Sequence, residues 1–368
     1  MEDRWDIFCR VIDNFGDIGV TWRLARQLAA EYDIQARLWV DDLESFRHLN
    51  PDLDPGLPCQ SSHGVEVCRW SDDFPPTATV ADVVIEAFAC ELPPSYLAAM
   101  AARAATGAAP VWINLEYLSA EAWVESCHGM ASPHPTLPLT KHFFFPGFTC
   151  NTGGLLREKD LLVRRDSIRP ARPGAAEKRE LEVFLFCYDN PALPGLLEAW
   201  RQSEQPIRLR IPPGAALTRA APGLAEGRSC QQGSLLIDAL PFVPQEQFDT
   251  QLWRSDVNFV RGEDSMVRAL WAGRPLVWQI YPQANQAHLP KLEAFLDLAG
   301  AGLAADAQAQ RDFWLAWNNA LPDPDWPALW RALDAALPAL DQWAAAWSGR
   351  LAIDDDLATR LVNFRKKK

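Results

Sequence analysis

The feature that most constrains the fold is a repeated alternation of short apolar runs with longer stretches of helical spacing. Helical sequence is expected at residues 20–32 and 94–105, between runs that are typical of buried strands. Strands and helices that alternate in this way favour a parallel sheet with helices on both faces. The predicted strands of the first half are residues 5–12, 34–40, 82–88 and 111–115.

The same alternation begins again after residues 164–179, a charged segment with Pro170, Pro173 and Gly174 that we interpret as a surface connection. We therefore expect an α/β protein of two facing Rossmann-like domains, at residues 1–165 and 180–344. A helical C-terminal tail should follow, and its last helix, about residues 345–368, could pack back on the first domain. The second half is predicted to contain strands at 181–186, 207–211, 235–240, 257–260 and 276–280, and helices at 192–201 and 266–272.

Charge and composition exclude several classes of protein. Lys and Arg number 35 against 48 Asp and Glu, and the net charge of −13 argues against a general nucleic-acid or acidic-membrane binder. The chain has no run of about 18 apolar residues and no signal-peptide pattern at its start, so we expect a cytoplasmic protein. Its eight cysteines form no Cys-x-x-Cys pair, and we expect them to be reduced and mostly buried.

The first candidate site is the segment Asp-Asn-Phe-Gly-Asp-Ile-Gly at residues 13–19, directly after the first predicted strand. Gly16 permits a tight turn, and the N-terminus of the following helix favours a negatively charged ligand. Of the two carboxylates, Asp13 and Asp17, one could act as a base while the other orients an acceptor. Alternatively, Asp13 is a turn residue and Asp17 a helix N-cap. The dinucleotide pattern Gly-x-Gly-x-x-Gly is absent, which disfavours a nicotinamide oxidoreductase.

The second candidate site is the segment Arg-Gly-Glu-Asp-Ser at residues 261–265, after the strand predicted at 257–260. Asp264 or Ser265 is a natural N-cap, and the backbone N–H groups of the turn could hold a diphosphate with Arg261 as its charged partner. Glu263 could then accept hydrogen bonds from sugar hydroxyls. The alternative is a capped helix whose charges are solvated.

Aromatic residues follow two strands of the second half. Tyr188 or Phe242 could stack on a nucleotide base, and Gln245 could read the edge of that base, although ordinary core packing is the alternative. The Asp-Asp-Asp run at residues 354–356 is interpreted as a solvated charge run or a helix start rather than a metal ligand set. We therefore predict no metal site.

Together, these motifs resemble the protein-arginine rhamnosyltransferases of bacterial translation elongation factor P, the EarP family. The resemblance runs through residues 114–117, 143–154, 186–189 and 242–245 in addition to the two turns, and it covers almost the whole chain. It implies a GT-B glycosyltransferase that transfers rhamnose from dTDP-β-L-rhamnose to an arginine side chain of elongation factor P. The transfer would invert the anomeric centre and would use neither a metal nor a cofactor.

The resemblance also implies roles for individual residues. Asp17 would be the general base, Asp13 its supporting carboxylate, and Glu263 essential on the donor side. The alternatives are a GT-B enzyme with another sugar nucleotide and a small-molecule acceptor, or a non-catalytic module that binds a nucleotide sugar. The substrate-binding residues implied are Asn14, Phe15, Gly16, Tyr188, Phe242, Gln245, Arg261, Gly262, Asp264 and Ser265.

Overall fold

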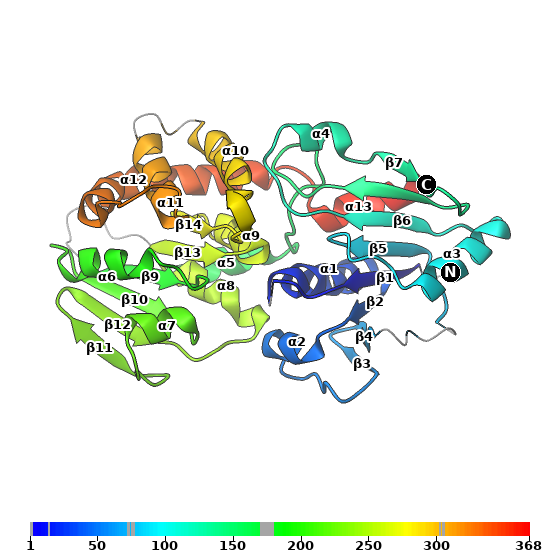
Figure 1. The fold of residues 1–368 in the computed structure, drawn as a ribbon, viewed down its shortest axis with the longest axis horizontal. Coiled ribbons are helices and arrows are strands. Elements are labelled where there is room, and N and C mark those ends of the chain that lie inside the picture. Colours follow the sequence, from blue (N-terminus) through cyan, green and yellow to red (C-terminus); the bar gives the residue numbers. More distant parts are fainter. Residues whose placement is uncertain are drawn as a thin grey trace. The chain divides into compact units, whose positions relative to one another are not determined.

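The computed structural model of the chain describes residues 3–13, 15–71, 74, 78–169, 180–301, 303 and 306–368 (Figure 1). The chain divides into two compact units, of which the first comprises Met1–Lys159 together with Ala352–Lys368 and the second Asp160–Leu351. Each unit contains one sheet of largely parallel strands with helices packed on it.

The first unit contains an eight-stranded sheet in the order β3-β4-β2-β1-β5-β6-β8-β7. All neighbouring strands are parallel except the two outer pairs, β3 with β4 and β7 with β8. The strands are β1 (Arg4–Cys9), β2 (Gln35–Val40), β3 (Cys59–Ser62), β4 (Val65–Arg69), β5 (Val83–Ala87), β6 (Val111–Leu115), β7 (Ala131–Pro133) and β8 (Thr140–Phe144). The helices are α1 (Gly16–Tyr32), α2 (Leu43–Leu49), α3 (Pro94–Ala105), α4 (Trp123–Cys127) and α13 (Leu357–Lys366).

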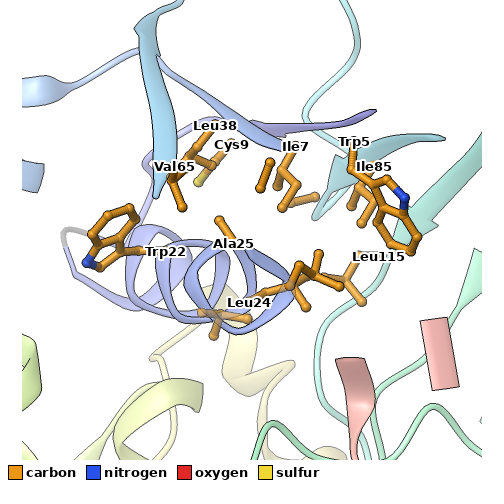
Figure 2. Packing of buried hydrophobic residues seen from close by; sticks show 14 of the residues in the cluster. Trp5, Ile7, Cys9, Trp22, Leu24, Ala25, Leu38, Val65, Ile85 and Leu115 are labelled. Carbon is orange, nitrogen blue, oxygen red and sulfur yellow. The ribbon is translucent and has the colours of Figure 1, made fainter. Parts of the chain in front are cut away.

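The two faces of this sheet are covered by different helices because successive side chains of a strand point to opposite sides. Ile7 and Cys9 of β1 point toward Ala25 of α1 (Figure 2), in a cluster that also contains Leu361 of α13. Phe8 lies on the opposite face, where its ring packs against that of Tyr96 from α3. Burial of each large apolar side chain in such a core contributes about 1.5–3 kcal/mol.

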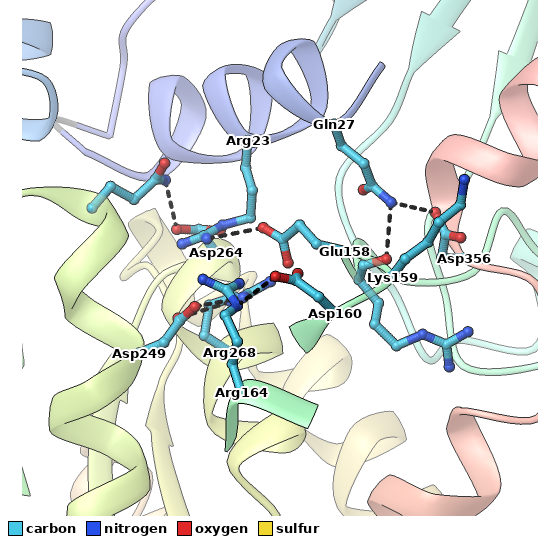
Figure 3. A network of polar contacts seen from close by, with 12 residues as sticks. Arg23, Gln27, Glu158, Lys159, Asp160, Arg164, Asp249, Asp264, Arg268 and Asp356 are labelled. Atoms are coloured by element: carbon cyan, nitrogen blue, oxygen red, sulfur yellow. Dashed lines mark hydrogen bonds and ion pairs between the residues drawn. The ribbon is translucent and has the colours of Figure 1, made fainter. Parts of the chain in front are cut away.

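The last helix of the chain is anchored in the first unit by a buried polar contact. The side chain of Asp356 caps α13 by accepting hydrogen bonds from the backbone N–H groups of Ala358 and Thr359. Gln27 of α1 donates to the same carboxylate, with 3.1 Å between Nε2 and Oδ1 (Figure 3). The interpretation of residues 354–356 as a helix start is therefore confirmed.

The second unit contains a six-stranded sheet in the order β11-β12-β10-β9-β13-β14, in which only β11 is antiparallel to its neighbour. Its aromatic core includes Trp200 of α6 and Trp330 of α12, whose ring centroids lie 5.4 Å apart. The strands are β9 (Leu181–Leu185), β10 (Ile207–Ile211), β11 (Ser229–Gln232), β12 (Leu235–Ala239), β13 (Val257–Arg261) and β14 (Leu276–Gln279). The helices are α5 (Leu161–Ile168), α6 (Leu193–Arg201), α7 (Ala215–Ala220), α8 (Gln245–Arg254), α9 (Glu263–Ala272), η1 (Ala284–Gln286), α10 (Leu289–Gly300), α11 (Asp306–Trp317) and α12 (Trp326–Leu351).

Most predicted elements are confirmed, and the strands at 111–115 and 207–211 agree residue for residue. The interpretation of residues 164–179 as a surface connection is wrong at its start, because α5 extends to Ile168. Residues 170–179 lie outside the described part of the chain.

The expectation that all eight cysteines are reduced is also wrong. Cys59 and Cys68 face each other across β3 and β4 with 4.1 Å between their Cα atoms, and their sulfurs form a disulfide. Among the helices that the structure describes, none is both long enough and apolar enough to cross a bilayer.

Candidate active site

The acidic turn of the first unit lies between the end of β1 and the start of α1. Helix α1 begins at Gly16 with Phe15 as its N-cap, so the alternative interpretation of Asp17 as the N-cap is wrong. Instead, Oδ2 of Asp17 accepts hydrogen bonds from the backbone N–H groups of Ile12 and Asp13, both with N–O distances of 2.9 Å. The carboxylate thus fixes the shape of the turn that precedes its own helix.

The residues around Asp17 are packed closely. A Cβ atom at Gly16 would collide with the carboxylate of Asp13, so any larger residue there would force that side chain to move. The Phe15 ring packs edge-on against His48, with 5.8 Å between the ring centroids. Asn14, which the sequence also placed here, lies outside the described residues. The structure therefore brings Asp13, Phe15, Gly16 and Asp17 together in one turn.

Burial changes the acidity of Asp17, whose residue is only 3% exposed. Removal of the carboxylate from water raises its pKa, because burial penalises the charged form. Hydrogen bonds from the backbone N–H groups of Asp13 and Ile12 and from the Tyr117 hydroxyl lower the pKa of Asp17, but burial outweighs them and the net shift is upward. A carboxylate that is buried, ordered and made more basic in this way suits a general base.

Tyr117 lies in the segment 114–117 that carries part of the resemblance, although the sequence assigned it no individual chemical role. It follows β6, its side chain is 38% exposed, and its hydroxyl contacts Asp17. Its ring stacks on Phe88 with 4.5 Å between the centroids. Phe88 and Ala89 both have left-handed backbone angles, with φ of 58° and 54°, and such strained residues concentrate at functional sites. The end of β5 and the end of β6 therefore contribute an aromatic wall beside the acidic turn.

The second turn lies between β13 and α9. Its N-cap is Gly262, not Asp264 or Ser265 as the sequence suggested, because this residue adopts a φ of 61° and a ψ of −169°, which favour glycine. The indole Nε1 of Trp278 donates to the carbonyl of Gly262 over 2.7 Å and holds the turn in place. Helix α9 begins with Glu263 at this turn, and the positive end of a helix dipole favours an anion there.

An aromatic group surrounds Arg261 at the end of β13. Its guanidinium carbon lies 4.5 Å from the ring centroid of Phe186 and 4.5 Å from that of Tyr188, which is cation–π geometry. Tyr188 is fixed by its backbone N–H, which donates to Gln279 Oε1 over 2.9 Å, and it contacts the edge of Tyr281. The structure thus places Arg261 and Tyr188 in direct contact.

Helix α8 is joined to α9 by two polar contacts. Gln245, the first residue of α8, donates through Nε2 to Oδ2 of Asp264 over 3.0 Å. Deeper in the core, Arg268 and Asp249 form a buried bidentate salt bridge, with N–O distances of 2.9 and 2.5 Å (Figure 3). These contacts bring Gln245 to the second turn. Ser265 is buried in the first turn of α9, whereas Phe242 precedes α8 and is 37% exposed.

Glu263 has a partner that sequence reasoning missed. Lys291 of α10 places its Nζ atom 2.8 Å from Oε1 of Glu263. The two residues are separated by 28 positions, and nothing in the sequence around Lys291 distinguishes it from an ordinary helix lysine. Only the packing of α10 against the second turn identifies it.

Near the two turns, the described residues include no group of side chains placed to share a metal ion. Within the part of the chain that the structure describes, one group of His, Cys, Asp or Glu side chains is close enough to share an ion, namely Cys59, Glu66 and Cys68. The two sulfurs of this group form the disulfide and belong to the β3–β4 hairpin.

The fold is that of the GT-B class of glycosyltransferases. Solved structures of that class match the chain over its length, including MurG of Acinetobacter baumannii, with a TM-score of 0.56, 15% identity and full coverage of both chains. At that identity the match shows the fold alone.

The family is shown by the sequence comparisons. The model of the family "Elongation-Factor P (EF-P) rhamnosyltransferase EarP" matches residues 5–366, so the chain belongs to the EarP family of protein-arginine rhamnosyltransferases. Relatives named protein-arginine rhamnosyltransferase include one from Pseudomonas putida, 48% identical over 99% of both chains, and one from Pseudomonas aeruginosa, 48% identical over 98% of both. A solved structure described as the structural basis for EarP-mediated arginine glycosylation of translation elongation factor EF-P matches with a TM-score of 0.66, 34% identity and full coverage of both chains.

Proposed function

We propose that this chain transfers rhamnose from dTDP-β-L-rhamnose to an arginine side chain of elongation factor P, with inversion at the anomeric carbon. The observation that carries the proposal is the state of Asp17, a buried carboxylate of raised pKa that two backbone N–H groups and Tyr117 hold in one position. Membership of the EarP family supports the choice of sugar and acceptor.

The reaction is a single displacement. A guanidine nitrogen of the acceptor attacks the anomeric carbon, a C–N bond forms, and the C–O bond to dTDP breaks. The guanidinium stays protonated in water because its pKa exceeds about 12, so its proton leaves as the new bond forms. Asp17 receives that proton, while Asp13 helps to hold and polarise the guanidinium. The departing dTDP carries away the electron pair of the broken bond.

The sugar nucleotide is proposed to bind at the turn that precedes α9. The backbone N–H groups of that turn and the guanidinium of Arg261 neutralise the diphosphate as it leaves. Glu263 accepts hydrogen bonds from hydroxyls of the sugar. Tyr188 and Phe242 contact the thymine, and Gln245 reads its edge. The proposed reaction needs no metal and no cofactor, and we expect a chelator to leave it unchanged.

The acceptor is a cationic side chain on a translation factor, and the enzyme is proposed to meet it in the cytoplasm. The net charge of −13 favours association with a basic arginine loop, chiefly through the rate of encounter. That attraction should weaken as salt is added.

Mass spectrometry tests this proposal directly. Elongation factor P is incubated with the enzyme and dTDP-β-L-rhamnose, and peptide fragmentation should locate one added deoxyhexose on an arginine. The matched control is elongation factor P with that arginine replaced by lysine, which should stay unmodified. An unmodified wild-type factor, with the donor intact, would contradict the proposal, and transfer to a small molecule would favour another GT-B activity.

A further inference from the structure

Lys291 occupies an unusual position in its helix. It lies in the first turn of α10 (Leu289–Gly300), where the positive end of the helix dipole disfavours a cation. Its ammonium group is nevertheless half-enclosed there, 2.8 Å from Oε1 of Glu263, and the two side chains are 23% and 17% exposed. The carboxylate therefore compensates for the unfavourable placement of the lysine.

The position of Glu263 is also unfavourable, because its carboxylate lies where an anionic ligand is expected to bind. It is the first residue of α9, and the backbone N–H groups of that same turn are where the proposed function puts a diphosphate. An unpaired carboxylate at this point would repel the phosphates, and the repulsion would be stronger in a partly buried site than in water. The contact with Lys291 makes the pair neutral overall, so the sugar-binding carboxylate can remain at the phosphate-binding turn.

We propose that Lys291 is a positioning residue for the donor site: it cancels the charge of Glu263 and holds its carboxylate in place, so that a nucleoside diphosphate can bind at the α9 turn. This inference rests on the proposed function, because it assumes that the turn receives a diphosphate. Lys291 acts through Glu263 and does not itself contact the phosphates.

Calorimetric titration separates this role from a purely structural one. The variants are Lys291→Met, Lys291→Arg and the double variant Glu263→Gln with Lys291→Met. A matched control is Lys141→Met in the first unit, because Lys141 forms a similar ion pair with Glu86, at 3.2 Å and with 24% exposure. Each protein is titrated with dTDP and with thymidine, which has the base but no phosphate, and urea unfolding checks that each variant is folded.

The charge-cancelling role predicts a specific pattern. Lys291→Met should bind dTDP about tenfold more weakly than wild type, because one partly screened negative charge is exposed to the diphosphate. Its affinity for thymidine should not change, and Lys291→Arg and Lys141→Met should bind dTDP as wild type does. The double variant should regain dTDP affinity, because the repelling charge is gone, but its turnover should stay low without the carboxylate of Glu263.

Three results would overturn the inference. Lys291→Met could bind dTDP as tightly as wild type. It could lose thymidine and dTDP affinity equally, which would indicate a general distortion of the second unit. The double variant could stay as weak as Lys291→Met, which would mean that the ammonium group contacts the phosphates itself.

The donor assignment is tested separately by titrating wild type with UDP and GDP beside dTDP. If wild type prefers UDP or GDP, the thymine assignment is wrong, and the Lys291 comparison is made with the preferred nucleotide. If wild type binds no nucleoside diphosphate at all, both proposals are overturned.

Discussion

Replacing Asp17 by asparagine should separate the chemistry of the acidic turn from its structural role. Asparagine has the same shape as aspartate, and its carbonyl oxygen can accept the two hydrogen bonds that Oδ2 of Asp17 receives from Ile12 and Asp13. The turn should therefore keep its conformation, while the carboxylate proposed as the base is lost. Loss of a positioned general base lowers the rate by about 10²–10⁴-fold.

Although Asp17→Asn should lose activity, it should gain stability relative to wild type as pH rises. Because burial raises the pKa of Asp17 in the folded state, the folded protein holds this proton more tightly than the unfolded chain does. The stabilisation from the protonated carboxyl is present at low pH and is lost as pH rises through the raised pKa of Asp17. Asparagine never ionises, so the stability of Asp17→Asn relative to wild type should increase over that pH range and remain constant above it.

The assay pairs rhamnosylation kinetics with urea unfolding at several pH values. Asp41→Asn is a matched control, because Asp41 accepts a hydrogen bond from the backbone N–H of Val11 in the same region, over 2.9 Å, and has no assigned catalytic role. We expect Asp41→Asn to keep nearly all activity. Wild-type turnover by Asp17→Asn would refute its role as base, and a stability loss that grows with pH would refute the explanation of its raised pKa.

Two further predictions concern the buried pair and the aromatic wall. Asp249→Ala leaves the guanidinium of Arg268 buried without its carboxylate, so urea unfolding should show a loss of about 3–5 kcal/mol, and a loss below about 1 kcal/mol would contradict the structure. Tyr117→Phe removes the hydroxyl that lowers the pKa of Asp17, so that pKa should rise and the acid limb of kcat/KM should move to higher pH. An unchanged pH profile would show that this hydroxyl does not act on Asp17.

The alternation of elements was predictable because buried strands and amphipathic helices leave strong local patterns. Helix α3 was predicted with its observed bounds, and α9 ends at Ala272 as predicted, where Gly273 follows in the left-handed conformation. The start of α9 was not predicted correctly, since Asp264 and Ser265 are good N-caps by composition. The backbone of Gly262, fixed by contact with Trp278, places the cap two residues before Asp264.

Features that depend on tertiary packing left no local signal. The disulfide of Cys59 and Cys68 follows from the register of an antiparallel pair, which spacing alone does not specify. Lys291 is brought to Glu263 by the packing of α10, and the stacking of Tyr117 on Phe88 joins the ends of two separate strands. The two turns of the candidate site could thus be predicted as motifs, whereas their partners Tyr117 and Lys291 required coordinates.

The anomeric configuration of the product tests the proposed mechanism most directly. Rhamnosylated elongation factor P made from dTDP-β-L-rhamnose is digested, and the one-bond coupling between C1 and H1 of the sugar is measured by NMR. A single attack by the guanidine nitrogen, with Asp17 as the base, predicts an α-linked rhamnose. A β-linked product would require two successive displacements or another nucleophile, and would contradict the mechanism.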